Sequence, residues 1–119
     1  MPGQTRKSLE TTVSRLLELA TDRVNCVAYT RHVPTMAHQR AISPQTLPSP
    51  ESKQALFDVI VKGFSASGYT WIGLDCFAKS GDALCLAQQQ GRLCKNWTGY
   101  TTQPTPYFVG LGTNAVIDL

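Results

Sequence analysis

Apolar residues recur at helical spacing in two stretches of the chain. The first covers residues 8–20, where Ser8 offers an N-cap, and its apolar face comprises Leu9, Val13, Leu16, Leu17 and Ala20. The second is better marked, because Ser49-Pro50-Glu51 supplies an N-cap, a proline at the first helical position and an acidic first turn. Gly68 is expected to end this second helix. The pattern predicts two amphipathic helices, and a shorter helix over Asp82–Gln90.

Three runs have the apolar, β-branched and aromatic composition of strands. They are Arg23–Tyr29, Tyr69–Leu74 and Tyr107–Leu111. Because strands alternate with helices, we expect an α/β fold with about three parallel strands and interleaved helices. Because three predicted helices cannot cover both faces of a parallel sheet, the pattern indicates part of a sheet or barrel. The proline-rich residues 30–50 are predicted to form a long polar loop.

Composition excludes several classes of function. With 119 residues, 42% of them hydrophobic and 16% charged, the chain is long and apolar enough to bury a core. The net charge is +3 and the basic residues are scattered, so no nucleic-acid partner is expected. The chain has neither a secretory signal nor an apolar run of about 20 residues, so we expect a cytoplasmic protein without a membrane partner.

The four cysteines give no metal signature. Cys26, Cys76, Cys85 and Cys94 form no Cys-x-x-Cys pair, and the only histidines are His32 and His38. A zinc site needs closely spaced ligands, and an intracellular chain keeps its thiols reduced. We therefore expect free thiols and no metal site within this chain.

A long ungapped motif begins at the end of the second predicted strand. It consists of Gly73-Leu74-Asp75-Cys76-Phe77-Ala78-Lys79, Asp82-Ala83-Leu84-Cys85-Leu86-Ala87-Gln88, Gly91-Arg92-Leu93 and Asn96-Trp97-Thr98-Gly99-Tyr100-Thr101-Thr102-Gln103. In residue type and spacing it resembles the "Gly-Met-Asp-His-Phe-Ala-Lys/Arg" to "Gly-Tyr-Thr-Thr-Gln" segment of the oxygen-independent coproporphyrinogen III oxidases, a radical-SAM family. Pro2-Gly3-Gln4-Thr5, His32-Val33-Pro34 and Leu47-Pro48 also fall in step, so the resemblance covers essentially the whole chain.

The resemblance implies the later part of a radical-SAM (β/α) barrel. Members of the family convert two propionates of coproporphyrinogen III to vinyl groups, giving protoporphyrinogen IX in haem biosynthesis. They use S-adenosylmethionine and a 4Fe–4S cluster held by an upstream Cys-x-x-x-Cys-x-x-Cys. Residues 1–119 contain no such triplet. We therefore expect an incomplete barrel domain, without the cluster-binding part and the C-terminal helical domain, that is inactive alone. The implied partner is a tetrapyrrole substrate, and the implied parent is a monomer.

The resemblance also suggests site residues. Thr30 and Val116 match positions that contact S-adenosylmethionine in the family, and no residue is assigned a catalytic role. The candidates for a substrate pocket are Tyr29, Arg40, Asp75, Lys79, Asn96 and Tyr100. Arginine and lysine suit the carboxylates of a tetrapyrrole, and the end of a barrel strand faces the catalytic mouth. Solvated surface charges, a capping aspartate and core aromatics are the simpler interpretations of the same residues.

Departures from the family pattern leave two other hypotheses open. Cys76 stands in place of a histidine, Ser80-Gly81 replaces "Pro-Asp", and residues 104–107 replace an acidic "Gly-Asp-x-Asp". One alternative is a relative that carries haem without decarboxylating it. The other is a fragment with no function of its own.

Overall fold

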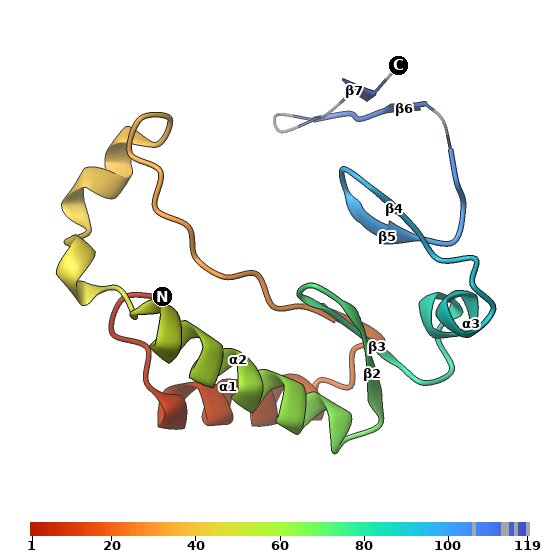
Figure 1. Ribbon diagram of the computed structural model, residues 1–119, viewed down its shortest axis with the longest axis horizontal. Coiled ribbons are helices and arrows are strands. Elements are labelled where there is room, and N and C mark those ends of the chain that lie inside the picture. The colour runs from red at the N-terminus through yellow and green to blue at the C-terminus, as the bar shows by residue number, and fades with distance from the viewer. Residues whose placement is uncertain (106, 113–114, 116, 119) are drawn as a thin grey trace. The chain divides into compact units, whose positions relative to one another are not determined.

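In the computed structural model the chain divides into two compact units, Met1–Lys79 (unit 1) and Ser80–Leu119 (unit 2). The structure describes residues 1–105, 107–112, 115 and 117–118. The elements of unit 1 are α1 (Arg6–Glu18), β1 (Arg23–Asn25), the 3₁₀ helices η1 (Ala37–Ala41) and η2 (Pro44–Thr46), α2 (Pro50–Ser65), β2 (Tyr69–Gly73) and β3 (Cys76–Lys79) (Figure 1). Those of unit 2 are α3 (Ala83–Gln89), β4 (Cys94–Asn96), β5 (Gly99–Thr101), β6 (Phe108–Val109) and β7 (Ile117–Asp118).

The helices follow the predicted pattern, with one correction. At α2, the Ser49 hydroxyl accepts a hydrogen bond from Ser52 N at 3.2 Å, which confirms the predicted N-cap. At α1, the predicted N-cap Ser8 is wrong, because Thr5 caps the helix. Thr5 Oγ1 accepts from Ser8 N at 3.2 Å and Ser8 Oγ accepts from Thr5 N at 3.0 Å, a reciprocal capping box. Ser8 therefore belongs to the cap, but at the third helical position.

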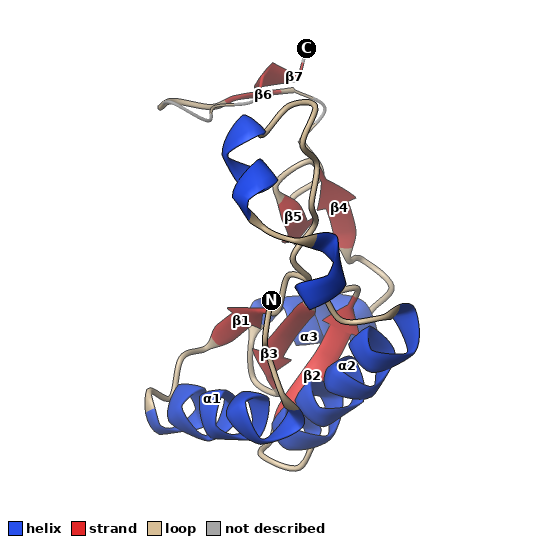
Figure 2. Ribbon diagram, turned by 90° about the vertical axis from the view of Figure 1, so that its left-hand side faces the viewer, coloured by secondary structure: helices blue, strands red, loops and turns tan. Residues whose placement is uncertain are grey.

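The α/β class is confirmed, but the expected parallel pairing of strands is wrong. The sheet of unit 1 has the order β1-β3-β2, and β3 is antiparallel to both neighbours (Figure 2). Only a two-residue turn joins β2 to β3, whereas parallel neighbours need a crossover of a dozen residues or more. The described strands of unit 2 form two antiparallel pairs, β4 with β5 and β6 with β7. The predicted loop over residues 30–50 contains η1 and η2.

The core of unit 1 lies between its sheet and its two long helices. Helix α1 packs on α2, and α2 packs on β2 (Figure 1). The buried cluster consists of Val13, Phe64, Tyr69 and Phe77. Partly buried residues from α1, α2 and the β1 region surround it, including Leu17, Val24, Cys26, Phe57 and Ile60. This core holds the two helices against the three-stranded sheet.

Candidate functional site

The candidate site lies at the end of the sheet where β1 and β2 finish and β3 begins. β1 and β2 are each antiparallel to β3, so they run in the same direction and their carboxyl ends share one edge. Residues at such an edge line the ligand-binding face of α/β folds. Here Cys26 N donates a hydrogen bond to Asp75 O at 2.8 Å, and Asn25 pairs with Cys76. We call Cys26, Asp75 and Cys76 the strand-end site.

An unusual turn places Asp75. Leu74 has a φ of 47°, a conformation that L-residues with side chains rarely adopt. The indole Nε1 of Trp71 donates to Leu74 O at 3.0 Å, and the register between β2 and β3 shifts between Trp71 and Gly73. These features make a tight turn in which Asp75 is half-buried and its carbonyl is used by Cys26. Asp75 therefore lies in the turn between β2 and β3, two residues beyond the end of β2 at Gly73, and does not close the strand as predicted.

The thiol of Cys26 is held in its neutral form. Its pKa is raised from 9.0 to about 11, chiefly by burial and further by the negative charges that Asp75 and Cys76 can carry. A thiol in this state is a poor nucleophile and a poor metal ligand at neutral pH. Among the described residues, no three histidine, cysteine, aspartate or glutamate side chains come together as a metal site.

This pKa predicts a loss of stability at high pH. Between pH 9 and 11 the unfolded chain loses the Cys26 proton while the folded chain keeps it, so the free energy of unfolding falls as the pH rises through that window. Below pH 9 both states hold the proton and the group contributes no pH dependence. Thermal unfolding at pH 8 and pH 10.5 tests this against Cys26→Ala, which should lose less stability over the same interval. Equal losses in the two proteins would contradict the prediction.

Beyond β1 the chain passes Tyr29, whose hydroxyl oxygen is buried. That oxygen has no hydrogen-bond partner among the residues the structure describes. Tyr29 borders a mostly apolar cavity of about 100 Å³, which is lined by β1-side residues such as Cys26 and by Leu56, Phe57 and Ile60 of α2. A buried polar atom without a partner costs stability, and such atoms are concentrated at functional sites.

Removal of the Tyr29 hydroxyl is expected to stabilise the chain. Tyr29→Phe keeps the ring and deletes the unpaired oxygen, so the free energy of unfolding should rise by about 1 kcal/mol. Tyr69→Phe is the matched control, because the Tyr69 hydroxyl donates to Thr21 O at 2.5 Å and its loss should destabilise by a similar amount. Urea unfolding followed by circular dichroism measures both. Destabilisation by Tyr29→Phe would show that the hydroxyl is paired.

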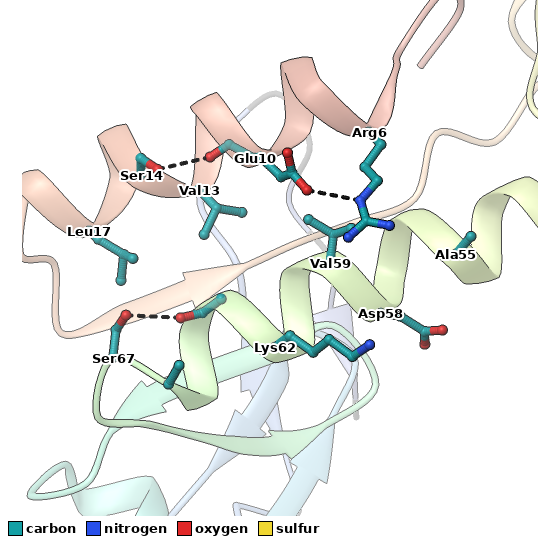
Figure 3. Close-up of a pocket in the computed structure, with 12 residues that line it drawn as sticks. Arg6, Glu10, Val13, Ser14, Leu17, Ala55, Asp58, Val59, Lys62 and Ser67 are labelled. Carbon is teal, nitrogen blue, oxygen red and sulfur yellow. Dashed lines mark hydrogen bonds and ion pairs between the residues drawn. The ribbon is translucent and has the colours of Figure 1, made fainter.

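A larger hollow of about 560 Å³ opens between α1 and α2 (Figure 3). Its lining includes Arg6, Glu10, Asp58 and Lys62, and none of the candidate residues borders it. Size alone therefore does not identify the site, and we place it at the strand end. None of the helices in the described part of the chain has the length and apolar character that crossing a bilayer requires.

No protein-family model matches the chain. It is 39% identical over 117 residues to the oxygen-independent coproporphyrinogen III oxidase of Escherichia coli strain K12, and 35% identical over 117 residues to that of Thermostichus vulcanus. These alignments cover 98% of this chain but only 25% and 36% of the two relatives. The solved structure of HemN from Escherichia coli, described as a radical-SAM coproporphyrinogen III oxidase, matches with a TM-score of 0.89 and 37% identity, over 98% of this chain and 27% of that one.

The resemblance to the oxygen-independent coproporphyrinogen III oxidases is confirmed. The chain has the fold of one part of such an oxidase, so the α/β class and the radical-SAM fold expected from the motif both hold. It spans about a quarter to about a third of the length of these relatives.

The oxidase-like motif falls in both units, and within unit 1 its charged residues Asp75 and Lys79 are not brought together. Lys79 lies at the opposite end of β3 from Asp75. Its ammonium donates to Ala20 O at 2.5 Å and pairs with Asp22 Oδ1 at 3.2 Å. These contacts are exposed and lie within unit 1, so they agree with the simpler interpretation of Lys79 as a solvated surface charge. A role in binding substrate stays a prediction for it.

In unit 2 the motif covers α3 and the β4–β5 hairpin. Asn96 Oδ1 accepts hydrogen bonds from Thr98 N at 2.9 Å and from Thr98 Oγ1 at 2.7 Å, which shapes the turn. Tyr100 is half-buried and pairs with Lys95 across the two strands, and Trp97 at the turn is 77% exposed. The structure thus gives Asn96 a turn-forming contact and leaves Trp97 exposed, with Tyr100 half-buried.

Two of the three remaining candidates, Thr30 and Arg40, lie in the loop after β1. Thr30 and Arg40 are exposed, Arg40 being part of η1, whereas Val116 lies outside the described residues. Sequence reasoning missed Gln39, which is 4% exposed and bonds to the backbone on both sides of Arg31. A glutamine in a polar loop carries no signal of burial, so only the folded loop identifies it.

Proposed function

We propose that this chain is the substrate-facing part of an oxygen-independent coproporphyrinogen III oxidase. The reaction is the oxidative decarboxylation of two propionates of coproporphyrinogen III to vinyl groups, which gives protoporphyrinogen IX in haem biosynthesis. The observation that carries the proposal is the match in sequence and fold to that oxidase over 98% of the chain.

The cysteines of this chain do not fit the 4Fe–4S cluster on which the family depends. A cluster of this kind is held by thiolates. Burial raises the pKa of the Cys26 thiol to about 11, Cys76 and Cys85 are buried, and no three ligand side chains converge among the described residues. The cluster ligands of the whole protein would therefore lie outside these residues. S-adenosylmethionine would meet this chain at the backbone of Thr30, with Val116 as its second contact.

The residues of this chain would bind and orient the substrate. Asp75 presents a half-buried carboxylate at the strand end, and its position depends on a backbone bond that a side-chain change leaves intact. Arg40 exposes a guanidinium that can pair with a propionate carboxylate. Tyr29, in the loop after β1, has a buried hydroxyl without a partner in the described part of the chain. We assign no general acid or base.

A chimera tests the proposal. The matching 117 residues of the Escherichia coli oxidase are replaced by this chain, and the porphyrins formed from coproporphyrinogen III are separated and quantified. We expect decarboxylation to be retained. Asp75→Asn in the chimera should lower kcat/KM by about 10- to 100-fold, the worth of one charge-assisted contact, without changing its unfolding temperature. A folded chimera that binds the tetrapyrrole but forms no vinyl product would contradict the proposal and favour a carrier.

A further inference from the structure

Gln39 is the one buried polar side chain among the described residues, with 4% of its surface exposed. A buried carboxamide has an acceptor oxygen and two donor hydrogens, and it destabilises the fold unless these atoms find hydrogen-bond partners. Gln39 Oε1 accepts from His32 N at 2.5 Å, and Gln39 Nε2 donates to Thr30 O at 3.2 Å. Nε2 also lies 3.4 Å from the sulfur of Met36. Both ends of the amide are therefore used.

These bonds hold the backbone on either side of Arg31. The Arg31 guanidinium Nε in turn donates to Ile42 O at 3.1 Å, and Met36 N donates to His32 O at 2.9 Å. The segment 30–32 is thus joined to residues 36–42 largely by side chains. This segment lies outside β1, which ends at Asn25. Its conformation consequently depends on Gln39 and not on a strand ladder.

We propose that Gln39 is a positioning residue that sets the conformation in which the Thr30 backbone meets S-adenosylmethionine. The inference rests on the proposed function, because that function places the cofactor at Thr30. In this proposal the side chain does not reach the ligand itself; it fixes the carbonyl of Thr30 and the amide of His32, which flank Arg31. A preset backbone binds a ligand more tightly than one that must be ordered on binding.

Glutamine is suited to this role because its carboxamide has both a hydrogen-bond acceptor, the oxygen, and a donor, the NH₂ group. Gln39→Glu keeps an acceptor for His32 N but loses the donor to Thr30 O and buries a carboxylate. Gln39→Leu keeps the volume and loses both bonds. We therefore expect the effect on binding to be larger for leucine than for glutamate. Gln45→Leu is the matched control, because Gln45 lies in the same loop, is exposed, and bonds only locally to Ser43.

The first measurement uses the chain itself. Hydrogen exchange of the His32 amide should be at least about tenfold faster in Gln39→Leu than in the unmodified chain, because its acceptor is lost. Gln45→Leu should leave that rate unchanged. An unchanged exchange rate of the His32 amide in Gln39→Leu would overturn the inference, even if the chimera is active.

The second measurement uses the chimera with its cluster in place and labelled S-adenosylmethionine in equilibrium dialysis. Gln39→Leu is expected to raise the Kd for S-adenosylmethionine about tenfold while the KM for coproporphyrinogen III stays the same. Gln39→Glu should give a smaller increase in the same direction and provides the test if the leucine variant does not fold.

The outcomes separate this inference from the proposed function. Equal binding by Gln39→Leu and the unmodified chimera, or equal weakening by Gln39→Leu and Gln45→Leu, would overturn the role of Gln39. A chimera that binds S-adenosylmethionine in a Gln39-dependent way but does not decarboxylate would support the inference and overturn the function. Absence of binding by every version would overturn both.

Discussion

Phe77→Ala is expected to lower the free energy of unfolding by about 3–5 kcal/mol, the largest effect of any single substitution considered for this chain. Phe77 is fully buried on the central strand β3. Its ring stacks on Phe64 at a centroid distance of 5.2 Å and on Trp71 at 6.4 Å. Truncation removes these contacts and leaves a cavity that the strands on both sides prevent from collapsing.

Such a loss matters because domains of this size have only about 5–15 kcal/mol of stability. Urea unfolding followed by circular dichroism of α1 and α2 measures it. Phe77→Leu should cost markedly less, since most of the volume remains, and Leu19→Ala, at a residue 70% exposed, should change stability by about 0.5 kcal/mol or less. A similar cost for Phe77→Ala and Leu19→Ala would mean that the core described for unit 1 is not formed in solution.

Helices were predictable because their signals are local. The apolar spacing of α1 and the Ser49-Pro50 start of α2 each lie within a few residues of the element they specify. The misplaced start of α1 has a local cause as well. Thr5 and Ser8 are both good capping residues three positions apart, and in a reciprocal box each bonds to the backbone of the other.

Strands were predicted less well because their pairing depends on turns that have no sequence signature here. β3 follows β2 through Leu74, whose left-handed conformation is stabilised by the Trp71 indole and by tertiary context. Leucine is not a turn residue, so Tyr69–Leu74 reads as one strand with no hairpin turn inside it. The β4–β5 turn does carry such signals in Asn96 and Gly99, and Gly99 adopts a φ of 131° in the structure.

The candidate site also depends partly on a local motif, which can be read from the sequence, and partly on contacts between residues far apart in the sequence, which cannot. The motif around Asp75 was visible in the sequence, whereas the bond from Cys26 N to Asp75 O joins residues almost fifty positions apart. That bond brings Cys26 to the site, and no pattern in the chain indicates it. Gln39 is a parallel case, because its burial follows from the path of residues 30–42 and not from any neighbour in sequence.

A second large effect is expected where α1 and α2 cross. Gly63 lies within α2, where alanine would ordinarily stabilise the helix by about 1 kcal/mol. A Cβ atom at Gly63, however, would lie 2.7 Å from Cγ1 of Val13, which points from α1 toward α2 (Figure 3). Val13 is 5% exposed, and a β-branched side chain in a helix has essentially one rotamer. We therefore expect Gly63→Ala to destabilise, because an overpacking cost of about 1–3 kcal/mol exceeds the gain in helix propensity.

The sign of the Gly63→Ala effect should reverse when Val13 is truncated. In a Val13→Ala background the clashing methyl is gone, so Gly63→Ala should fill part of the space and raise the free energy of unfolding by up to about 1 kcal/mol. The coupling energy between the two positions, measured by urea unfolding of all four proteins, is expected to be about 1–3 kcal/mol. Additive effects would mean that α1 and α2 are farther apart at this crossing. Because these helices pack on the sheet at whose end Cys26, Asp75 and Cys76 lie, such a change in spacing would also alter the support of the strand-end site.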